Sequence, residues 1–473
     1  MNTIPADAIL GSWMTEGWRF RVDIVAEADG YAGYLTEGLE NGERDMANPD
    51  PALRGRSLLG SRLFYGLVYK DSLWKGGKLY NPENGTYYDV EMQIAGENRL
   101  DLRIFMGLRW LGITQHWERF GVRKDLEYEE IETAAGLSSD LVWPTKRAQA
   151  WYAAHPWPVG CNYIPSNAIN QLEMWQRDTF TPELIAKELD LAQSLGFNTL
   201  RVYLHDILWR HDRESFINRI KRFLDLAASR GLSVMFILFD DCWNDRAHPG
   251  RQPKPRKGVH NSGWVRSPTS RFINDEKAWP LLEDYVSGII SEFQFDERVY
   301  AWDLYNEIGN SVGFLPNSTR LLGLTFRWAR QMNPSQPVTA GIWKGSSWFR
   351  GLNEFLIRNS DIITFHDYSP LDTLRSKIEA LSAYGKPLVC TEYMARTQNS
   401  RFETHLPLFR EWGVGAMSWG LVSGKTQTIY PWGSRPGSEE PEVWFHDIFR
   451  PDGTPWSEQE VRAIRSITGL VAP

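Results

Sequence analysis

The sequence predicts a multidomain protein in which a (β/α)8 TIM barrel follows a small antiparallel all-β barrel. Residues 9 to about 122 form short period-two runs separated by turn signals, a pattern typical of antiparallel strands. From Val159 onward, runs rich in Val, Ile, Leu and Phe alternate with helical patterns, as buried parallel strands do. Eight such units over ~310 residues favour a (β/α)8 barrel, and a doubly wound sheet is the alternative.

The composition is that of an ordinary globular chain and excludes several functions. The 473 residues carry a net charge of −7, so Lys and Arg lack the excess that binding nucleic-acid phosphates requires. No apolar run approaches the ~20 residues of a membrane span, and no secretory signal pattern opens the chain. We therefore expect a cytoplasmic protein, or a secreted or periplasmic one if a leader was removed, with neither nucleic acid nor membrane as partner. The oligomeric state stays open.

Cysteine and histidine usage predicts no metal site and no cofactor. The three cysteines, Cys161, Cys242 and Cys390, are scattered and lie in or beside apolar strands, where buried thiols are common. None of the nine histidines forms an H-x-H or H-E-x-x-H motif, which argues against a metal-dependent hydrolase. The number of tryptophans, 22, is unusually high. Aromatic faces can stack on sugar rings, although we expect most of these tryptophans to be core residues.

The N-terminal all-β unit is predicted to span residues 1–123, as a barrel or a sandwich. Its alternating runs lie at 18–24, 87–94 and 100–105. Turn signals lie at 40–42, 76–77 and 83–85. Three segments of this unit, 48–56, 74–87 and 112–119, resemble in the same order an uncharacterised family of small bacterial lipocalin-like β-barrels. The resemblance implies a lipocalin-like barrel and no chemistry. Such a barrel can hold a small ligand or act as a scaffold for the catalytic domain, and we favour the scaffold.

Residues 124–156 are predicted to be a linker. The segment begins with the acidic run 125–132, and the Pro–Trp pairs at 143–144 and 156–158 interrupt regular structure. The barrel domain is then predicted to cover residues 157–473. Its helices are expected near 182–195, with Thr181 as N-cap and Gly196 as the stop, and near 213–230 and 277–294.

Eight strands are predicted in the second domain, ending or lying at 160–163, 198–203, 232–239, 299–307, 338–342, 361–366, 387–392 and 416–419. The fourth strand ends on Asn306 and Glu307, and the seventh ends on Glu392. The two glutamates are 85 residues apart (392 − 307), close to three units of ~30 residues each. In a (β/α)8 barrel, side chains at these strand ends face the same opening, where catalysis takes place.

Two carboxyl groups facing each other across a barrel opening are the apparatus of glycoside hydrolysis. One protonates the leaving oxygen, and the other attacks the anomeric carbon or activates water. A single strand-end glutamate is more often a helix cap or an ion-pair partner. Two glutamates at matching strand ends, one of them preceded by Asn, instead favour a catalytic role for the pair.

Segments 302–307 and 388–392 resemble the signatures of the clan of retaining barrel glycosidases that includes the family 5 cellulases and mannanases. The resemblance covers about residues 157–468. It implies hydrolysis of β-glycosidic bonds in oligo- or polysaccharides by double displacement, with Glu392 as nucleophile and Glu307 as general acid/base. We accordingly expect Glu392 to stay ionised and Glu307 to have a raised pKa.

The same resemblance assigns further roles around the pair. It implies that Asn306 binds the sugar 2-hydroxyl and that Arg201 keeps the nucleophile ionised. His366 and Tyr368 match the pair that orients the two glutamates, and Trp419 matches the platform under the sugar in the −1 subsite. Other candidate sugar-binding residues at strand ends are Asn162, Asp240, Trp243 and Trp343.

The third strand departs from the family pattern. Family 5 enzymes usually have a histidine there, whereas this chain has Asp240-Asp-Cys-Trp243. The subsites and the sugar therefore stay open, because selectivity depends on loops such as 241–264 and 426–444. A serine-hydrolase motif at 309–313 is disfavoured because its strand has already ended on Glu307. The main rival is a non-catalytic carbohydrate-binding protein on a retired barrel.

Overall fold

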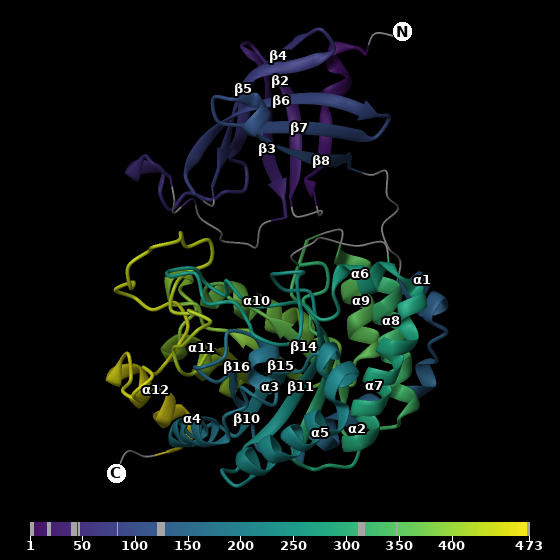
Figure 1. Ribbon diagram of the computed structural model, residues 1–473, viewed down its shortest axis with the longest axis vertical. Helices are drawn as coiled ribbons and strands as arrows, with labels where there is room; N and C mark the ends of the chain where they lie inside the picture. The colour runs from purple at the N-terminus through teal and green to yellow at the C-terminus, as the bar shows by residue number, and fades with distance from the viewer. Residues whose placement is uncertain are drawn as a thin grey trace. The chain divides into compact units, whose positions relative to one another are not determined.

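The structure, a computed structural model, describes residues 4–16, 20–38, 45, 48–82, 84–120, 128–310, 317–346 and 349–470. The chain divides into two compact units, one of residues 1–126 with 344–350 and one of residues 127–343 with 351–473 (Figure 1). Several sequence expectations lie outside the described residues: Trp18, the turn at 40–42, the start of the acidic run at 125–127, and positions 311–313 of the serine-hydrolase motif.

The N-terminal unit is a closed barrel of eight antiparallel strands, so the predicted barrel is confirmed and the sandwich is excluded. Each strand pairs with the next along the chain, and the first pairs with the last. The strands are β1 (Gly11–Met14), β2 (Arg21–Glu27), β3 (Gly30–Glu37), β4 (Arg62–Lys70), β5 (Leu73–Asn81), β6 (Thr86–Gly96), β7 (Arg99–Phe105) and β8 (Ile113–Arg119).

Large apolar side chains fill the interior of this barrel, as expected for eight strands. Trp13, Phe64, Trp74 and Trp117 are all buried in one cluster. A polar network joins Asp45 to Tyr80, Asn48 and Arg56. There the hydroxyl of Tyr80 donates to the buried carboxylate of Asp45 (2.5 Å), which also accepts from Asn48 and Arg56. The motif at 48–56 is thus explained by the structure of the barrel.

The second unit contains eight parallel strands in the order β13-β12-β11-β10-β9-β16-β15-β14. A parallel bridge between Ile342 and Phe365 joins the two ends of this order and closes the barrel. The TIM barrel is therefore confirmed, and the doubly wound sheet is excluded. The strands are β9 (Val159–Asn162), β10 (Thr199–Tyr203), β11 (Ser233–Asp240), β12 (Val299–Asn306), β13 (Val338–Thr339), β14 (Ile363–His366), β15 (Leu388–Tyr393) and β16 (Gly415–Trp419).

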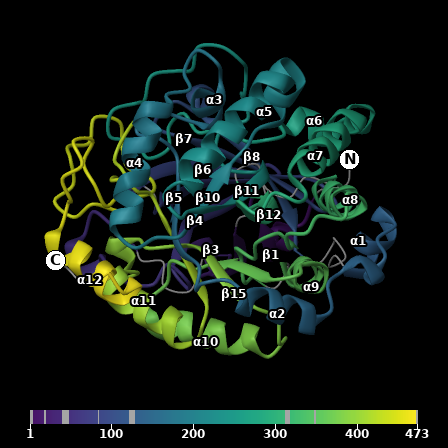
Figure 2. The same ribbon diagram turned by 90° about the horizontal axis from the view of Figure 1, so that it is seen from below.

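Helices form a ring around these strands (Figure 2). They are α1 (Tyr128–Ala135), α2 (Thr145–Ala153), α3 (Gln171–Trp175), α4 (Pro182–Ser194), α5 (Asp206–Ala228), α6 (Ser270–Asn274), α7 (Trp279–Phe293), α8 (Ser318–Gln331), α9 (Arg350–Asn359), α10 (Leu371–Ser382), α11 (Phe402–Glu411) and α12 (Glu458–Thr468). Among the described residues, no helix combines the length and apolarity needed to cross a membrane.

Two of the three predicted helices match closely, and one begins earlier than expected. The helix predicted near 213–230 starts at Asp206 and breaks at Asp212, whose φ of −153° is not helical. Thr181 precedes α4 as predicted, but its side chain makes no capping hydrogen bond and accepts one from Asn167 instead (2.9 Å). Gly196 adopts a φ of +75° just after the helix, a conformation that favours glycine.

The segment predicted as a linker belongs, from Tyr128 onward, to the barrel unit. It forms α1 and α2, and Ile131 and Ala135 of α1 are buried. The backbone N–H of Trp143 donates to Asp361 (2.8 Å), and Asn359 donates to Glu132 (2.8 Å). The acidic run therefore includes the solvent-facing side of an amphipathic helix, because its few apolar residues lie on one face.

Gly160 marks the closest approach of two barrel strands. A Cβ added to this residue of β9 would lie 1.6 Å from the carbonyl oxygen of Thr199 in β10. Gly160→Ala should therefore push the strands apart and lower the free energy of unfolding by about 3 kcal/mol, the upper range for overpacking. The midpoint of urea unfolding measures this. Gly345→Ala is the control, since its Cβ would meet open space, and an equal effect of the two variants would contradict the prediction.

Candidate active site

The structure brings Glu307 and Glu392 together at the ends of β12 and β15. Glu392 is the fifth residue of β15, and Glu307 follows β12 directly. One carboxylate oxygen from each, and one ring nitrogen of His366, all lie within 4.8 Å of one another. The spatial proximity that the strand spacing predicted is thus present.

Glu392 is buried and accepts hydrogen bonds at both oxygens. Its Oε1 accepts from Arg201 (2.7 Å) and from the hydroxyl of Tyr203 (2.9 Å), and its Oε2 accepts from the hydroxyl of Tyr368 (2.8 Å). Burial, together with the nearby Glu307, raises the pKa of this carboxyl above its ordinary value, and the hydrogen bonds from Arg201 and Tyr368 oppose this rise without cancelling it.

Arg201 connects most of the polar side chains under the site. Its fully buried guanidinium donates to Asp303 through Nε (3.0 Å) and Nη2 (2.7 Å) and to Asn306 through Nη2 (2.7 Å). It donates through Nη1 to Asn162 (2.9 Å) as well as to Glu392. Four strands, β9, β10, β12 and β15, are thereby joined at one cation.

Removing this cation should destabilise the barrel. Arg201→Met leaves the buried carboxylates of Asp303 and Glu392 without their shared partner, and breaking such a pair costs about 3–5 kcal/mol. The free energy of unfolding from urea titration measures this. Arg375→Met on α10 is the control, because Arg375 is only part-buried on a helix and does not belong to the polar group around Arg201. A loss below 1 kcal/mol for Arg201→Met would contradict the assignment.

Glu307 contacts a histidine, a thiol and an amide. Its Oε1 lies 2.7 Å from Nδ1 of His366, and its Oε2 accepts from Cys242 Sγ (3.2 Å) and Asn310 Nδ2 (2.5 Å). Burial lowers the pKa of His366 to about 4, so the ring is neutral near pH 7. Its buried Nε2 has no partner among the described residues, which favours the tautomer with hydrogen on Nδ1, donating to Glu307.

The backbone turn at Glu307 is held by Asp241. Glu307 has a φ of +44°, a conformation that costs a non-glycine residue roughly 1–3 kcal/mol. Oδ2 of Asp241 accepts from the N–H of Gly309 (2.7 Å), and the N–H of Asp241 donates to the carbonyl of Asn306 (3.2 Å). The buried guanidinium of Arg266 pairs with the same carboxylate. This contact between strand ends fixes the direction in which Glu307 leaves β12.

Asp240 and Asn162, both predicted to bind sugar, are buried and hydrogen-bonded to neighbouring groups of the protein. Oδ1 of Asp240 accepts from Cys242 N (3.0 Å) and Asn306 Nδ2 (3.0 Å), and Oδ2 accepts from the Trp264 and Gln171 side chains. Burial raises the pKa of Asp240 to about 6. The amide of Asn162 donates to the carbonyls of residues 391 and 418 while accepting from Arg201. With their polar atoms engaged, both side chains are placed to support the site from within.

The three predicted tryptophans lie in different parts of the opening. Trp419, at the end of β16, packs against Tyr203 and Trp264, with ring centroids 5.9 Å and 5.8 Å away. Trp243 has a φ of +67°, is 39% exposed, and lies beside the ring of His260. Trp343 donates from Nε1 to the carbonyl of Ile308, next to Glu307 (3.0 Å).

Sequence reasoning missed several residues of the site: Tyr203, Asp303, Cys242, Trp264 and Asn310. Tyr203 carried a usable signal, because it lies two residues after Arg201 in the same strand and so shares its face. Asp303 also carried one, as a charged residue inside an otherwise apolar strand. Trp264 and Asn310 belong to loops, and no sequence pattern placed them.

The Glu307–His366–Glu392 group has the donor atoms of a metal site. The oxygens of Glu392 already accept from Arg201 and two tyrosine hydroxyls, and those of Glu307 already accept from Cys242 and Asn310. A guanidinium 2.7 Å from one proposed ligand also repels a cation. The donor set therefore fits a hydrogen-bonded carboxyl pair better than a metal.

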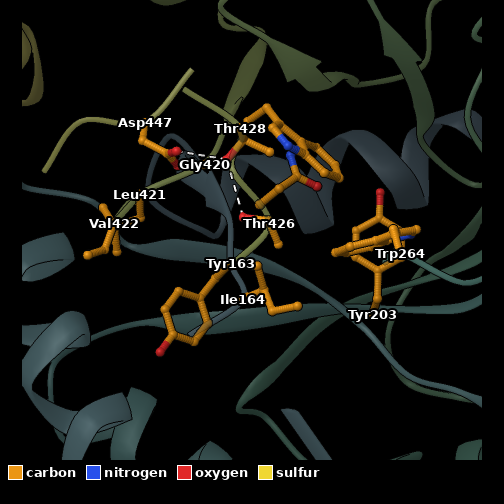
Figure 3. A pocket seen from close by; sticks show the side chains of 12 residues that line it. Tyr163, Ile164, Tyr203, Trp264, Gly420, Leu421, Val422, Thr426, Thr428 and Asp447 are labelled. Atoms are coloured by element: carbon orange, nitrogen blue, oxygen red, sulfur yellow. Dashed lines mark hydrogen bonds between the residues drawn. The ribbon is translucent and has the colours of Figure 1, made fainter. Parts of the chain in front are cut away.

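A small pocket lies over the ends of β9, β10 and β16. It shares with the site the side chain of Tyr203, whose hydroxyl donates to Glu392 (2.9 Å). Trp264 and Tyr203 lie together at one end of it, and Leu421 and Val422 lie at the other (Figure 3). Its lining residues are Asn162, Tyr163, Ile164, Tyr203, Trp264, Trp419, Gly420, Leu421, Val422, Thr426, Thr428 and Asp447.

The two units match different known proteins. Residues 11–119 match the model of the family described as "Uncharacterized protein conserved in bacteria (DUF2147)". A Helicobacter pylori protein described as belonging to the lipocalin family is 24% identical, with 26% of this chain and 87% of that chain covered and a TM-score of 0.22. No curated protein matches the chain.

Two solved structures align with the second unit. GH5_18 from Streptomyces cattleya, in complex with GlcNAc, is 14% identical, covering 67% of this chain and 81% of that chain with a TM-score of 0.45. An exo-β-1,4-mannosidase from Opitutaceae bacterium strain TAV5 is 19% identical, and the alignment covers 66% of this chain and 59% of that chain with a TM-score of 0.47. The chain therefore joins an antiparallel barrel that matches the DUF2147 model to a barrel of eight parallel strands.

Proposed function

We propose that the protein is a retaining β-glycoside hydrolase, with Glu392 as nucleophile and Glu307 as general acid/base. The observation that carries this proposal is the close approach of the two carboxyl groups, within 4.8 Å between their nearest oxygens. Retaining enzymes hold their carboxyl groups roughly 5–5.5 Å apart, whereas inverting enzymes need roughly 6.5–9.5 Å to admit a water. No space for such a water exists between groups this close.

In the first step, an oxygen of Glu392 attacks the anomeric carbon and forms a glycosyl ester. The glycosidic C–O bond breaks as Glu307 gives its proton to the leaving oxygen. In the second step, Glu307 takes a proton from water, and the water oxygen displaces Glu392. Each step inverts the configuration at the anomeric carbon, so the two steps together restore the starting configuration.

The surroundings suit these roles. Arg201, Tyr203 and Tyr368 donate to Glu392 and so favour its carboxylate form against the effect of burial. His366, neutral near pH 7, adds no charge between the two carboxyl groups. In this proposal, Asn306, which Arg201 and Asp240 hold in place, binds the sugar 2-hydroxyl. Trp419 supplies an aromatic face under the −1 sugar.

The test is a panel of aryl β-glycosides of glucose, mannose, xylose and galactose, with the first-formed anomer followed by proton NMR. Hydrolysis with release of the β-anomer supports the proposal, whereas release of the α-anomer contradicts it. A protein that binds these sugars without turnover would instead be the non-catalytic carbohydrate-binding protein. Activity that is lost in EDTA and restored by a divalent cation would favour metal chemistry at the same residues.

A further inference from the structure

The buried thiol of Cys242 lies between the two polar groups at the end of β12. Its Sγ donates to Oε2 of Glu307 (3.2 Å) and accepts from Nδ2 of Asn306 (3.4 Å). An amide nitrogen carries hydrogens and accepts none, so the thiol hydrogen has to point away from Asn306 and toward the carboxyl group. This two-sided contact fixes both the place of the sulfur and the direction of its S–H bond.

The amide of Asn306 is itself held in one orientation. Its Oδ1 accepts from Nη2 of Arg201 (2.7 Å), which leaves Nδ2 facing Cys242. Arg201 also donates to Glu392 (2.7 Å). Cys242 is therefore the last member of a chain of hydrogen bonds that begins at the cation beside Glu392 and ends on Glu307.

The end of β11 holds the thiol in place. The backbone of Asp240 pairs with that of Ser267 in both directions, with N–H to O distances of 2.5 Å and 2.8 Å. Oδ1 of Asp240 then accepts from the N–H of Cys242 (3.0 Å), and Trp243 turns the chain with a φ of +67°. The sulfur is thus carried by a strand end that is fixed through its own backbone.

The thiol is a neutral donor. Burial, together with the carboxyl groups of Asp240, Glu307 and Glu392, raises the pKa of Cys242 well above its ordinary value. The S–H bond is therefore present throughout the acidic and neutral range. Because a hydrogen bond donated to a carboxylate favours its charged form, this thiol favours the ionised form of Glu307.

We propose that Cys242 is a positioning residue for the general acid/base. Its thiol directs Oε2 of Glu307 and stabilises the carboxylate that forms when Glu307 gives its proton to the leaving oxygen. The thiol keeps its own hydrogen throughout both steps. This inference rests on the proposed function and adds to it a residue that sets the proton affinity of Glu307.

Other ionisable groups surround this contact. The titratable and charged side chains around Glu307 and Cys242 are His366, Tyr368, Glu392, Asp240 and Arg201. His366, with its pKa lowered to about 4, and Tyr368, with its pKa raised by burial, are both neutral near pH 7. Burial raises the pKa of Asp240 to about 6, so an experiment has to separate its titration from that of Glu307.

The first experiment follows kcat/KM of the full-length protein on aryl β-glycosides as a function of pH. In Cys242→Ala, the alkaline limb, which reports the protonated general acid, should move to higher pH by about 0.5–1 pH unit because the carboxylate loses a donor. The acid limb, which reports ionised Glu392, should stay in place. Cys242→Ser should restore the wild-type alkaline limb, because its hydroxyl can donate to the same oxygen.

Cys161→Ala is the matched control. It makes the same change of thiol to methyl in β9, next to Asn162 and so on the opposite face of the strand. Both limbs should keep their wild-type positions in this variant. An alkaline limb that stays in place in Cys242→Ala, or that moves equally in Cys161→Ala, would overturn the proposal.

The infrared S–H stretching band gives a second readout that needs no turnover. The difference spectrum between wild type and Cys242→Ala isolates the band of this thiol. Hydrogen bonding lowers the frequency of the band, so Glu307→Ala should raise it, whereas Asp240→Asn should leave it unchanged. A band that does not respond to Glu307→Ala, or that responds to Asp240→Asn instead, would overturn the proposal.

The two readouts separate failure of this inference from failure of the proposed function. Turnover of aryl glycosides with an unmoved alkaline limb in Cys242→Ala removes the role of the thiol alone. No turnover of any glycoside removes the proposed function and the role of Cys242 with it, even where the infrared band confirms the contact with Glu307.

Discussion

Glu392→Gln is expected to lower kcat on aryl β-glycosides by on the order of 10⁵- to 10⁶-fold, the scale seen when a covalent nucleophile is removed. The amide has the size of the carboxyl but cannot form the glycosyl ester. It also offers Arg201 no negative charge, although Arg201 retains Asp303 as a partner. Initial rates at saturating substrate measure the effect.

Glu379→Gln is the matched control for this substitution, because Glu379 is an exposed residue of α10. It should retain full activity. Circular dichroism of Glu392→Gln should match the wild type, which would separate lost chemistry from lost fold. Less than a 100-fold loss in a folded Glu392→Gln variant would remove Glu392 from the role of nucleophile.

Glu307→Ala is expected to lower kcat/KM by about 10²- to 10⁴-fold on glycosides with poor leaving groups, the usual contribution of general acid catalysis. On 2,4-dinitrophenyl glycosides, the loss should be much smaller for the first step, because that leaving group departs without a proton. The expected signature is a steep dependence of rate on leaving-group pKa, measured over a series of aryl glycosides.

Added azide provides a second readout for Glu307→Ala. Azide needs no general base, so it should accept the glycosyl group from Glu392, raise the rate and yield a β-glycosyl azide. Glu411→Ala, at the exposed end of α11, should show neither the leaving-group dependence nor the azide effect. An equal loss on all leaving groups, with no azide product, would mean that Glu307 acts only through structure.

The barrel and the positions of its two glutamates were predictable because they depend on continuous apolar runs that alternate with helical patterns. A buried parallel strand is apolar throughout, so the polar residues at its end mark the face of the barrel at which the strands end, as Glu307 and Glu392 do. Which strand-end residues face the substrate is decided in three dimensions. Asp240 looked equally available, yet Trp264 and Gln171, from distant parts of the chain, occupy one of its oxygens.

The segment at 128–153 shows a different reason for error. Its charge and its prolines suggested a linker, but α1 places Ile131 and Ala135 on one face, and both are buried. Eight residues are too few for a convincing helical pattern in the sequence. Packing against another element, here α8, decides whether such a helix forms.

The place of β9 in the barrel has a consequence for synthesis on the ribosome. This first strand pairs with β16, the last, through register pairs such as Gly160 with Met417. Until β16 emerges, β9 and β15 each present an unpaired edge, which can join to a wrong partner. The pocket over β9, β10 and β16 is completed later still, by Asp447. The nascent chain is therefore prone to association for most of its elongation, and C-terminal truncations before β16 should yield insoluble protein.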